Sequence, residues 1–198
     1  LLPNWKTALV AAPRKYIASN KDVRSQSEFV LLWFDLSSGN TVREVVTVPR
    51  SPGRFSLSSL ALSNDGRYVA VSTNYGGGVL FPSGEKHINR EPVSVYRTDN
   101  GVLVRDITLG GVAEGLAFSF DGASLFTSGA RVTAWHITRG AKLGEFDDSA
   151  RYVRQRDSNY MQMALSADGC TLAAGGTNTV IYVWSVKGCT RSTTMANK

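Results

Sequence analysis

Cysteine, histidine and long hydrophobic runs are all scarce in this sequence of 198 residues. Its two cysteines are too few for a disulfide-rich scaffold, and neither belongs to a Cys-x-x-Cys or Cys/His cluster of the kind that holds zinc. The longest apolar run, Phe29–Phe34, is far shorter than the roughly 18 residues of a membrane-spanning helix. Apolar residues make up 42% of the chain and charged residues 19%, which excludes an intrinsically disordered chain and favours a packed core.

The beginning of the sequence lacks both a methionine and a secretory signal. Residue 1 is Leu1, so we expect a processed chain or a piece of a longer one. No positively charged segment followed by an apolar stretch of about 7–15 residues is present, which is the pattern of a signal peptide. We therefore expect an intracellular, cytoplasmic location.

The basic residues outnumber the acidic ones by 22 to 16, but the excess lies near the two ends of the chain. Residues 1–27 contain five basic residues and one acidic residue, and residues 147–198 contain six and four. Residues 28–146 contain eleven of each. This balanced middle argues against a continuous track for nucleic acid.

One pattern recurs along the chain, and it organises the whole sequence. Ser-x-Asp-Gly is followed by alternating apolar residues in Ser63–Ser72, Ser119–Ser128 and Ser166–Gly175, and a degenerate copy without Asp-Gly covers residues 11–19. A short apolar alternation precedes each of the three complete copies. Asp-Gly between two such runs indicates a hairpin, because glycine adopts positive φ without steric cost. Each unit is therefore predicted to begin with two strands joined by a tight turn.

A second pattern closes the third strand of each unit, where an aromatic residue is followed five positions later by a glycine. The pairs are Phe34 with Gly39, Tyr96 with Gly101, Trp135 with Gly140 and, one position early, Trp184 with Gly188. Fourth strands are predicted at residues 41–48, 102–109 and 141–146, and no helical periodicity competes. The chain is thus predicted to be one domain of four-stranded units at approximately residues 1–56, 57–112, 113–159 and 160–198.

These two patterns together resemble the blades of WD-repeat β-propellers. Phe34-Asp35 is the closest match to the Trp-Asp pair of that family, whereas the Gly-His pair of its blades is absent. The resemblance implies an all-β fold of four-stranded antiparallel blades. About four blades are present, and a closed ring of this type has about seven, so we expect an incomplete ring that the same chain or another chain completes. A closed ring of four blades is the alternative.

Two segments are longer than their counterparts in the other units. Residues 74–91 follow the second strand of the second unit, and residues 147–159 connect the third and fourth units. In antiparallel blades both project from the same face, and binding residues concentrate on such loops. Arginine with tyrosine is typical of binding hot spots, although the charges in each segment cancel, as in a solvated loop. The predicted partner-binding residues are Tyr75, Phe81, Lys86, His87, Arg90, Arg151, Tyr152, Arg154 and Arg156.

No pattern in the sequence indicates catalysis. The glycines at 76–78 are not followed by the Gly-Lys-Ser/Thr ending of a phosphate-binding loop, so a hairpin tip is the better interpretation. The only histidines are His87 and His136, and no nucleophile elbow, His-x-x-x-His pair or acidic cluster accompanies them. We therefore expect no enzyme activity, no catalytic residues, no cofactor and no metal.

Five residues are expected to serve the fold. Trp33, Trp135 and Trp184 recur near the ends of third strands and are predicted to pack between blades. Cys170 and Cys189 lie at turns on the same face, so they can form a disulfide if their Cα atoms come within about 7 Å. The alternative is two free thiols in a reducing compartment.

These observations favour a non-enzymatic propeller scaffold that binds another protein within a larger assembly, with no membrane contact. The partner is a protein or a segment that completes the propeller. The first alternative is a propeller that binds nucleic acid or a ribonucleoprotein through its basic terminal segments. The second is a propeller enzyme of the lactonase or quinoprotein type, which needs a ligand set that two histidines do not supply.

Overall fold

The computed structural model describes residues 6–15, 27–47, 55–75, 92–109, 111–146, 160–177 and 179–186, and the structural statements below concern these ranges. They form fourteen β-strands in four antiparallel sheets of three or four strands, and they contain no helix. The all-β class expected from the sequence is confirmed. In the same ranges there is consequently no helix of the length and apolarity needed to cross a membrane.

Each sheet is an open meander in which consecutive strands pair. Sheet 1 contains β1 (Thr7–Lys15), β2 (Ser27–Asp35) and β3 (Thr41–Thr47). Sheet 2 contains β4 (Phe55–Leu62), β5 (Tyr68–Tyr75), β6 (Val93–Arg97) and β7 (Leu103–Ile107). Sheet 3 contains β8 (Gly115–Phe118), β9 (Ser124–Ser128), β10 (Val132–His136) and β11 (Lys142–Phe146). Sheet 4 contains β12 (Tyr160–Leu165), β13 (Thr171–Gly176) and β14 (Ile181–Ser185).

The two sequence patterns fold as the two kinds of hairpin turn that join these strands. Ser-x-Asp-Gly forms the β4–β5, β8–β9 and β12–β13 turns, and the aromatic-to-glycine pattern forms the β2–β3, β6–β7 and β10–β11 turns. The glycines of all six turns have φ between 66° and 71°, a conformation that costs other residues energy. In the second kind of turn the register shifts by one residue beside the aromatic position, as in a β-bulge.

A backbone hydrogen bond identifies corresponding strands in the four sheets. In each sheet, the N–H two residues after the aromatic position donates to the carbonyl just before one particular strand. The bonds are Leu36 to Lys6 (2.8 Å), Thr98 to Arg67 (2.9 Å), Ile137 to Ala123 (3.1 Å) and Val186 to Cys170 (2.9 Å). β1 therefore corresponds to the second strands β5, β9 and β13. Within the described ranges, sheet 1 has the second to fourth strands of a unit, and sheet 4 has the first to third.

The prediction that residues 11–19 contain a degenerate copy of the Ser-x-Asp-Gly turn is wrong. β1 runs through Pro13 to Lys15 and pairs with β2 along its length. Among the described residues β1 is an edge strand, which is where proline occurs within sheets. The residues before Lys6 lie outside the described ranges.

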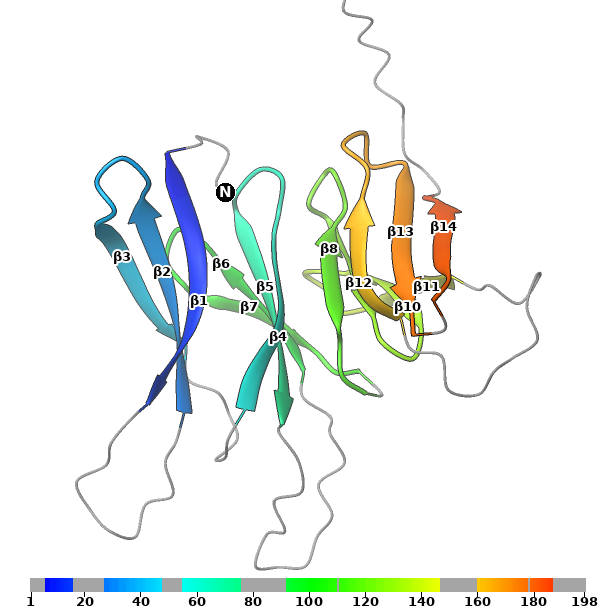
Figure 1. The fold of residues 1–198 in the computed structure, drawn as a ribbon, viewed down its shortest axis with the longest axis horizontal. Coiled ribbons are helices and arrows are strands. Elements are labelled where there is room, and N and C mark those ends of the chain that lie inside the picture. Colours follow the sequence, from blue (N-terminus) through cyan, green and yellow to red (C-terminus); the bar gives the residue numbers. More distant parts are fainter. Residues whose placement is uncertain are drawn as a thin grey trace, which may run out of the picture.

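The sheets pack face to face in chain order, with sheet 1 at the left end of the row and sheet 4 at the right end in Figure 1. β4, β8 and β12, the first strands of sheets 2 to 4, contact one another in turn, and β1 contacts β4. One hydrophobic cluster fills each of the three interfaces. Trp33, Trp135 and Trp184 each pack into one of these clusters, so the packing role predicted for them is confirmed.

Two buried serines also link neighbouring sheets. The Ser72 hydroxyl on β5 donates to the Ala113 carbonyl just before β8, at 2.9 Å. The corresponding Ser128 hydroxyl on β9 donates to the Met161 carbonyl on β12. Gly115 allows this approach, because a Cβ there would lie 2.7 Å from both the Met161 carbonyl oxygen and the Ser128 hydroxyl. Backbone groups of one sheet are thus held against the strands of the next.

Candidate functional site

The polar residues that recur in the Ser-x-Asp-Gly motif are used inside the turns that they form. The Ser63 hydroxyl donates to the Asp65 carboxylate at 2.7 Å and accepts the Tyr68 N–H at 2.9 Å, while the Arg67 N–H donates to the same carboxylate at 3.0 Å. The other two copies repeat these bonds, with hydroxyl-to-carboxylate distances of 2.6 Å and 2.5 Å. The motif is therefore a structural clamp between the first two strands of a unit.

Hydrogen bonds within two of these turns lower the pKa of the turn aspartate. The Ser119 hydroxyl and the Ala123 N–H lower the pKa of Asp121. Burial alone would raise the pKa of Asp65, but hydrogen bonds from Arg67 and Ser63 outweigh it and the net direction is downward. Proton-transfer catalysis near neutral pH needs a carboxyl group with a raised pKa, so these two aspartates do not have that character.

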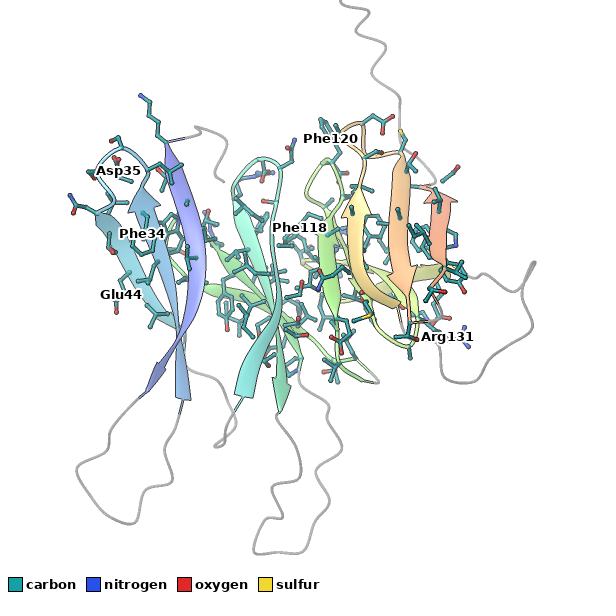
Figure 2. The ribbon with its side chains drawn as sticks, in the orientation of Figure 1. Phe34, Asp35, Glu44, Phe118, Phe120 and Arg131 are labelled. Carbon is teal, nitrogen blue, oxygen red and sulfur yellow. The ribbon has the colours of Figure 1, made fainter. Side chains whose placement is uncertain are left out.

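The Ser-x-Asp-Gly turns lie side by side at one end of the sheets, which we call the turn end. A Cβ on Gly122 would lie 3.6 Å from the Asp65 carboxylate of sheet 2, and one on Gly169 would lie 2.7 Å from the Cβ of Phe120. Phe120 is 58% exposed, and Figure 2 shows it at this end, opposite Arg131. At the turn end, the β8–β9 turn therefore presents the exposed Phe120 ring beside the β12–β13 turn.

We call the opposite end of the sheets the loop end. β5 and β11 end there and β6 and β12 begin there, because antiparallel strands alternate in direction. The strands that flank both long segments predicted to bind a partner thus terminate at one end of the molecule. Tyr75 is the last residue of β5, and nothing of its side chain is described. The other eight predicted residues lie outside the described ranges: Phe81, Lys86, His87, Arg90, Arg151, Tyr152, Arg154 and Arg156.

Among the described residues, no three His, Cys, Asp or Glu side chains are grouped so that they could hold a metal ion. His136 lies at the β10–β11 turn, with its Nδ1 3.2 Å from the Thr138 hydroxyl oxygen. The Arg131 guanidinium at the loop end pairs with the Glu145 carboxylate at 3.2 Å. Such exposed pairs stabilise the surface only weakly. Within the described ranges, His136 and Arg131 thus make local contacts with the turn and the strand that carry them.

Cys170, directly after the β12–β13 turn, is disulfide-bonded in the structure. The only other cysteine in the sequence, Cys189, lies outside the described residues. Of the two alternatives left open by the sequence, the structure thus favours the disulfide. Disulfides persist mainly in oxidising compartments, so this bond weighs against the cytoplasmic location that we expected.

No protein-family model matches the chain, and no curated protein matches it either. The surfaces must therefore be interpreted from their own residues. Our sequence analysis missed the exposed apolar side chains of sheet 4, above all Ile181 and Val183, which are 74% and 63% exposed. Their apolar character is visible in the sequence, but their exposure is not, because the counterparts of both residues in the other units are also apolar and are buried.

Proposed function

We propose that this chain is a WD-like β-propeller segment, an incomplete ring that acts as a non-enzymatic scaffold and binds a protein partner at its loop end. The observation that supports this proposal most is where the recurring polar residues make their hydrogen bonds. Each Ser and Asp of the motif is used in a hydrogen bond inside its own turn. The repeated residues thus build a frame, and the residues that differ between units are left for recognition.

The arrangement of the sheets supports the propeller part of the proposal. In a propeller, four-stranded meanders pack face to face around an axis lined by their first strands. Here β4, β8 and β12 contact one another in turn, and apolar clusters join successive sheets. Within the described ranges, sheets 1 and 4 each supply three of the four strands of such a unit.

The loop end is the better candidate for binding because the two longest connections of the chain, residues 76–91 and 147–159, are attached there to strands that the sheets hold in place. β5 is paired on both sides, with β4 and β6, and β12 is held by β13 and by the Ser128 hydroxyl. Loops on such a scaffold can hold side chains in place without weakening the core. Arginine and tyrosine in these loops match the composition of binding hot spots.

A capture experiment with matched variants tests this function. Replacing Arg151, Arg154 and Arg156 together with alanine should weaken retention of a specific protein by about 30-fold or more, since a hot-spot residue contributes about 2 kcal/mol. The matched control replaces three arginines of the turn end, Arg67, Arg97 and Arg139, and should leave retention unchanged.

Two outcomes would contradict the proposal. One is that the loop variant retains the same proteins as the wild type. The other is that the wild type retains only nucleic acid, with affinity that falls steeply as salt rises, because phosphate contacts release counterions. That second outcome would support the nucleic-acid alternative instead.

A further inference from the structure

The last strand of sheet 4 has one covered and one uncovered face. Tyr182 and Trp184 point toward sheet 3, where they pack with Phe146 and the other members of the interface cluster. Ile181 and Val183 alternate with them and therefore lie on the opposite face. Their exposures of 74% and 63% are unusual for β-branched residues within a strand.

In the other three sheets, the corresponding apolar pair is buried beneath the next sheet. The aromatic positions align Ile181 and Val183 with one pair in each of these sheets. The pairs are Leu31 and Trp33 in sheet 1, Val93 and Val95 in sheet 2, and Val132 and Ala134 in sheet 3, and all six residues are buried. The exposed face of sheet 4 is thus the face that always receives a following sheet.

The rest of this face is suited to the same contact. Ala173 lies between Ala164 and Val183 in the strand register, and Gly175 pairs with Ile181. None of the described residues at these positions is charged. Gly175 occupies the place of the linking serines Ser72 and Ser128, so one hydrogen bond to the next sheet is lost. Sheet 1 has Ala11 at this place and still packs against sheet 2, so that bond is not required.

Sheet 1, at the other end of the row, has the complementary uncovered face. Leu9, Leu31 and Trp33 point toward sheet 2, so Ala8, Val10, Leu32 and Phe34 lie on the far side. Val10 is 42% exposed, and Leu32 and Phe34 are partly exposed. The corresponding residues of sheets 2 to 4 include Val69, Leu125, Leu172 and Trp184, and these pack against the preceding sheet.

We infer that a second copy of this chain covers the exposed face of sheet 4 with the uncovered face of its sheet 1. Successive sheets pack face to face three times within the chain, and the exposed faces of sheet 4 and sheet 1 correspond to the two sides of that same contact. Sheet 1 and sheet 4 lie at opposite ends of the row (Figure 1), so one copy does not cover both faces of another by a single contact. This inference concerns assembly and holds whatever the loop end binds.

A contact of this kind is heterologous, so repeating it gives either a closed ring or a filament. Two copies would supply eight sheets, which lies within the roughly four to eight blades of closed β-propellers. A ring of two copies uses both end faces of both chains and leaves no apolar end face uncovered. A dimer is therefore the smallest assembly in which every apolar end face is covered.

The experiment uses two variants of the full chain, each of which blocks one half of the contact. Val183→Asp places a charge on the sheet 4 face, and Val10→Asp places one on the sheet 1 face. Leu143→Asp on β11, where the native residue is 55% exposed, is the matched control. The mass in solution is measured by light scattering after size-exclusion chromatography.

We expect the wild type and Leu143→Asp to have at least twice the mass of one chain, and each end variant alone to have the mass of one. A one-to-one mixture of the two end variants should return to the mass of two chains, since the mixture contains one intact half of each kind. Recovery in the mixture also shows that both variants are folded. A monomeric wild type, a Val10→Asp chain that still self-associates, or a mixture that remains monomeric would each overturn the inference.

Discussion

Single residues of the repeat act as clamps, and Ser63 shows why the motif needs a hydroxyl. Ser63 is buried, its hydroxyl donates to Asp65, and the same oxygen accepts the N–H that opens β5. Alanine can make neither bond. A buried donor or acceptor left unsatisfied costs about 1–3 kcal/mol, which is a large share of the stability of a domain.

We therefore predict that Ser63→Ala lowers the free energy of unfolding by about 1–3 kcal/mol. The matched control is Ser38→Ala, because Ser38 is an exposed turn serine whose hydroxyl accepts the Asn40 N–H at 3.3 Å and hydrogen-bonds to the Asp35 carboxylate at the surface. Its effect should stay below about 0.5 kcal/mol. Chemical denaturation of both variants at one chain concentration measures the difference. Equal losses would show that the clamp contributes nothing beyond an ordinary turn hydrogen bond.

At the scale of the element, the sequence predicted the turns better than it predicted the first strand. Asp65-Gly66 and its repeats identify hairpins because few residues besides glycine adopt φ near 70° at low cost. The interpretation of residues 11–19 failed because apolar and small residues there fit a turn-flanking strand and a continuous strand equally well. Pairing with β2, which the sequence does not display, decided between them.

The glycines of two turns should differ in their sensitivity to substitution although their backbones agree. Gly39 has φ 69°, and a Cβ there would meet no atom within 4 Å, whereas Gly169 has φ 71° and a Cβ there would lie 2.7 Å from the Cβ of Phe120. Both alanine variants lose about 1–2 kcal/mol from the left-handed conformation. Gly169→Ala should lose about 1–3 kcal/mol more, because the turns of sheets 3 and 4 must separate.

Denaturation of Gly39→Ala and Gly169→Ala, compared with the wild type under the same conditions, checks this prediction. Equal destabilisation would mean that the turns of neighbouring sheets are not in contact at the turn end.

At the scale of the whole molecule, the repeat in the sequence predicts the order of the sheets, but it does not predict which sheet faces are exposed. Alternation marks Ile181 and Val183 as one face of a strand, and the same alternation marks Val93 and Val95. Only the position of neighbouring sheets shows that the first pair is exposed and the second buried. The loop residues predicted to bind a partner, such as Arg154, lie outside the described residues, so that part of the candidate site stays a prediction.

In the proposed assembly, one association equilibrium buries both end faces of the chain, that of sheet 1 and that of sheet 4. If sheet 4 of one copy covers sheet 1 of another, both end faces become buried at the same chain concentration. The described outer strand β11 belongs to an interface within one copy, so its environment stays the same. Association stabilises the elements that it buries by mass action.

Amide hydrogen exchange at two chain concentrations tests this account most directly. We predict that exchange in β14 and in β1 slows together as the concentration rises, while exchange in β11 does not change. Slowing confined to β14 would mean that sheet 4 faces another sheet 4, and no dependence on concentration would mean that copies of this chain do not cover each other's ends. Either result would contradict the head-to-tail contact.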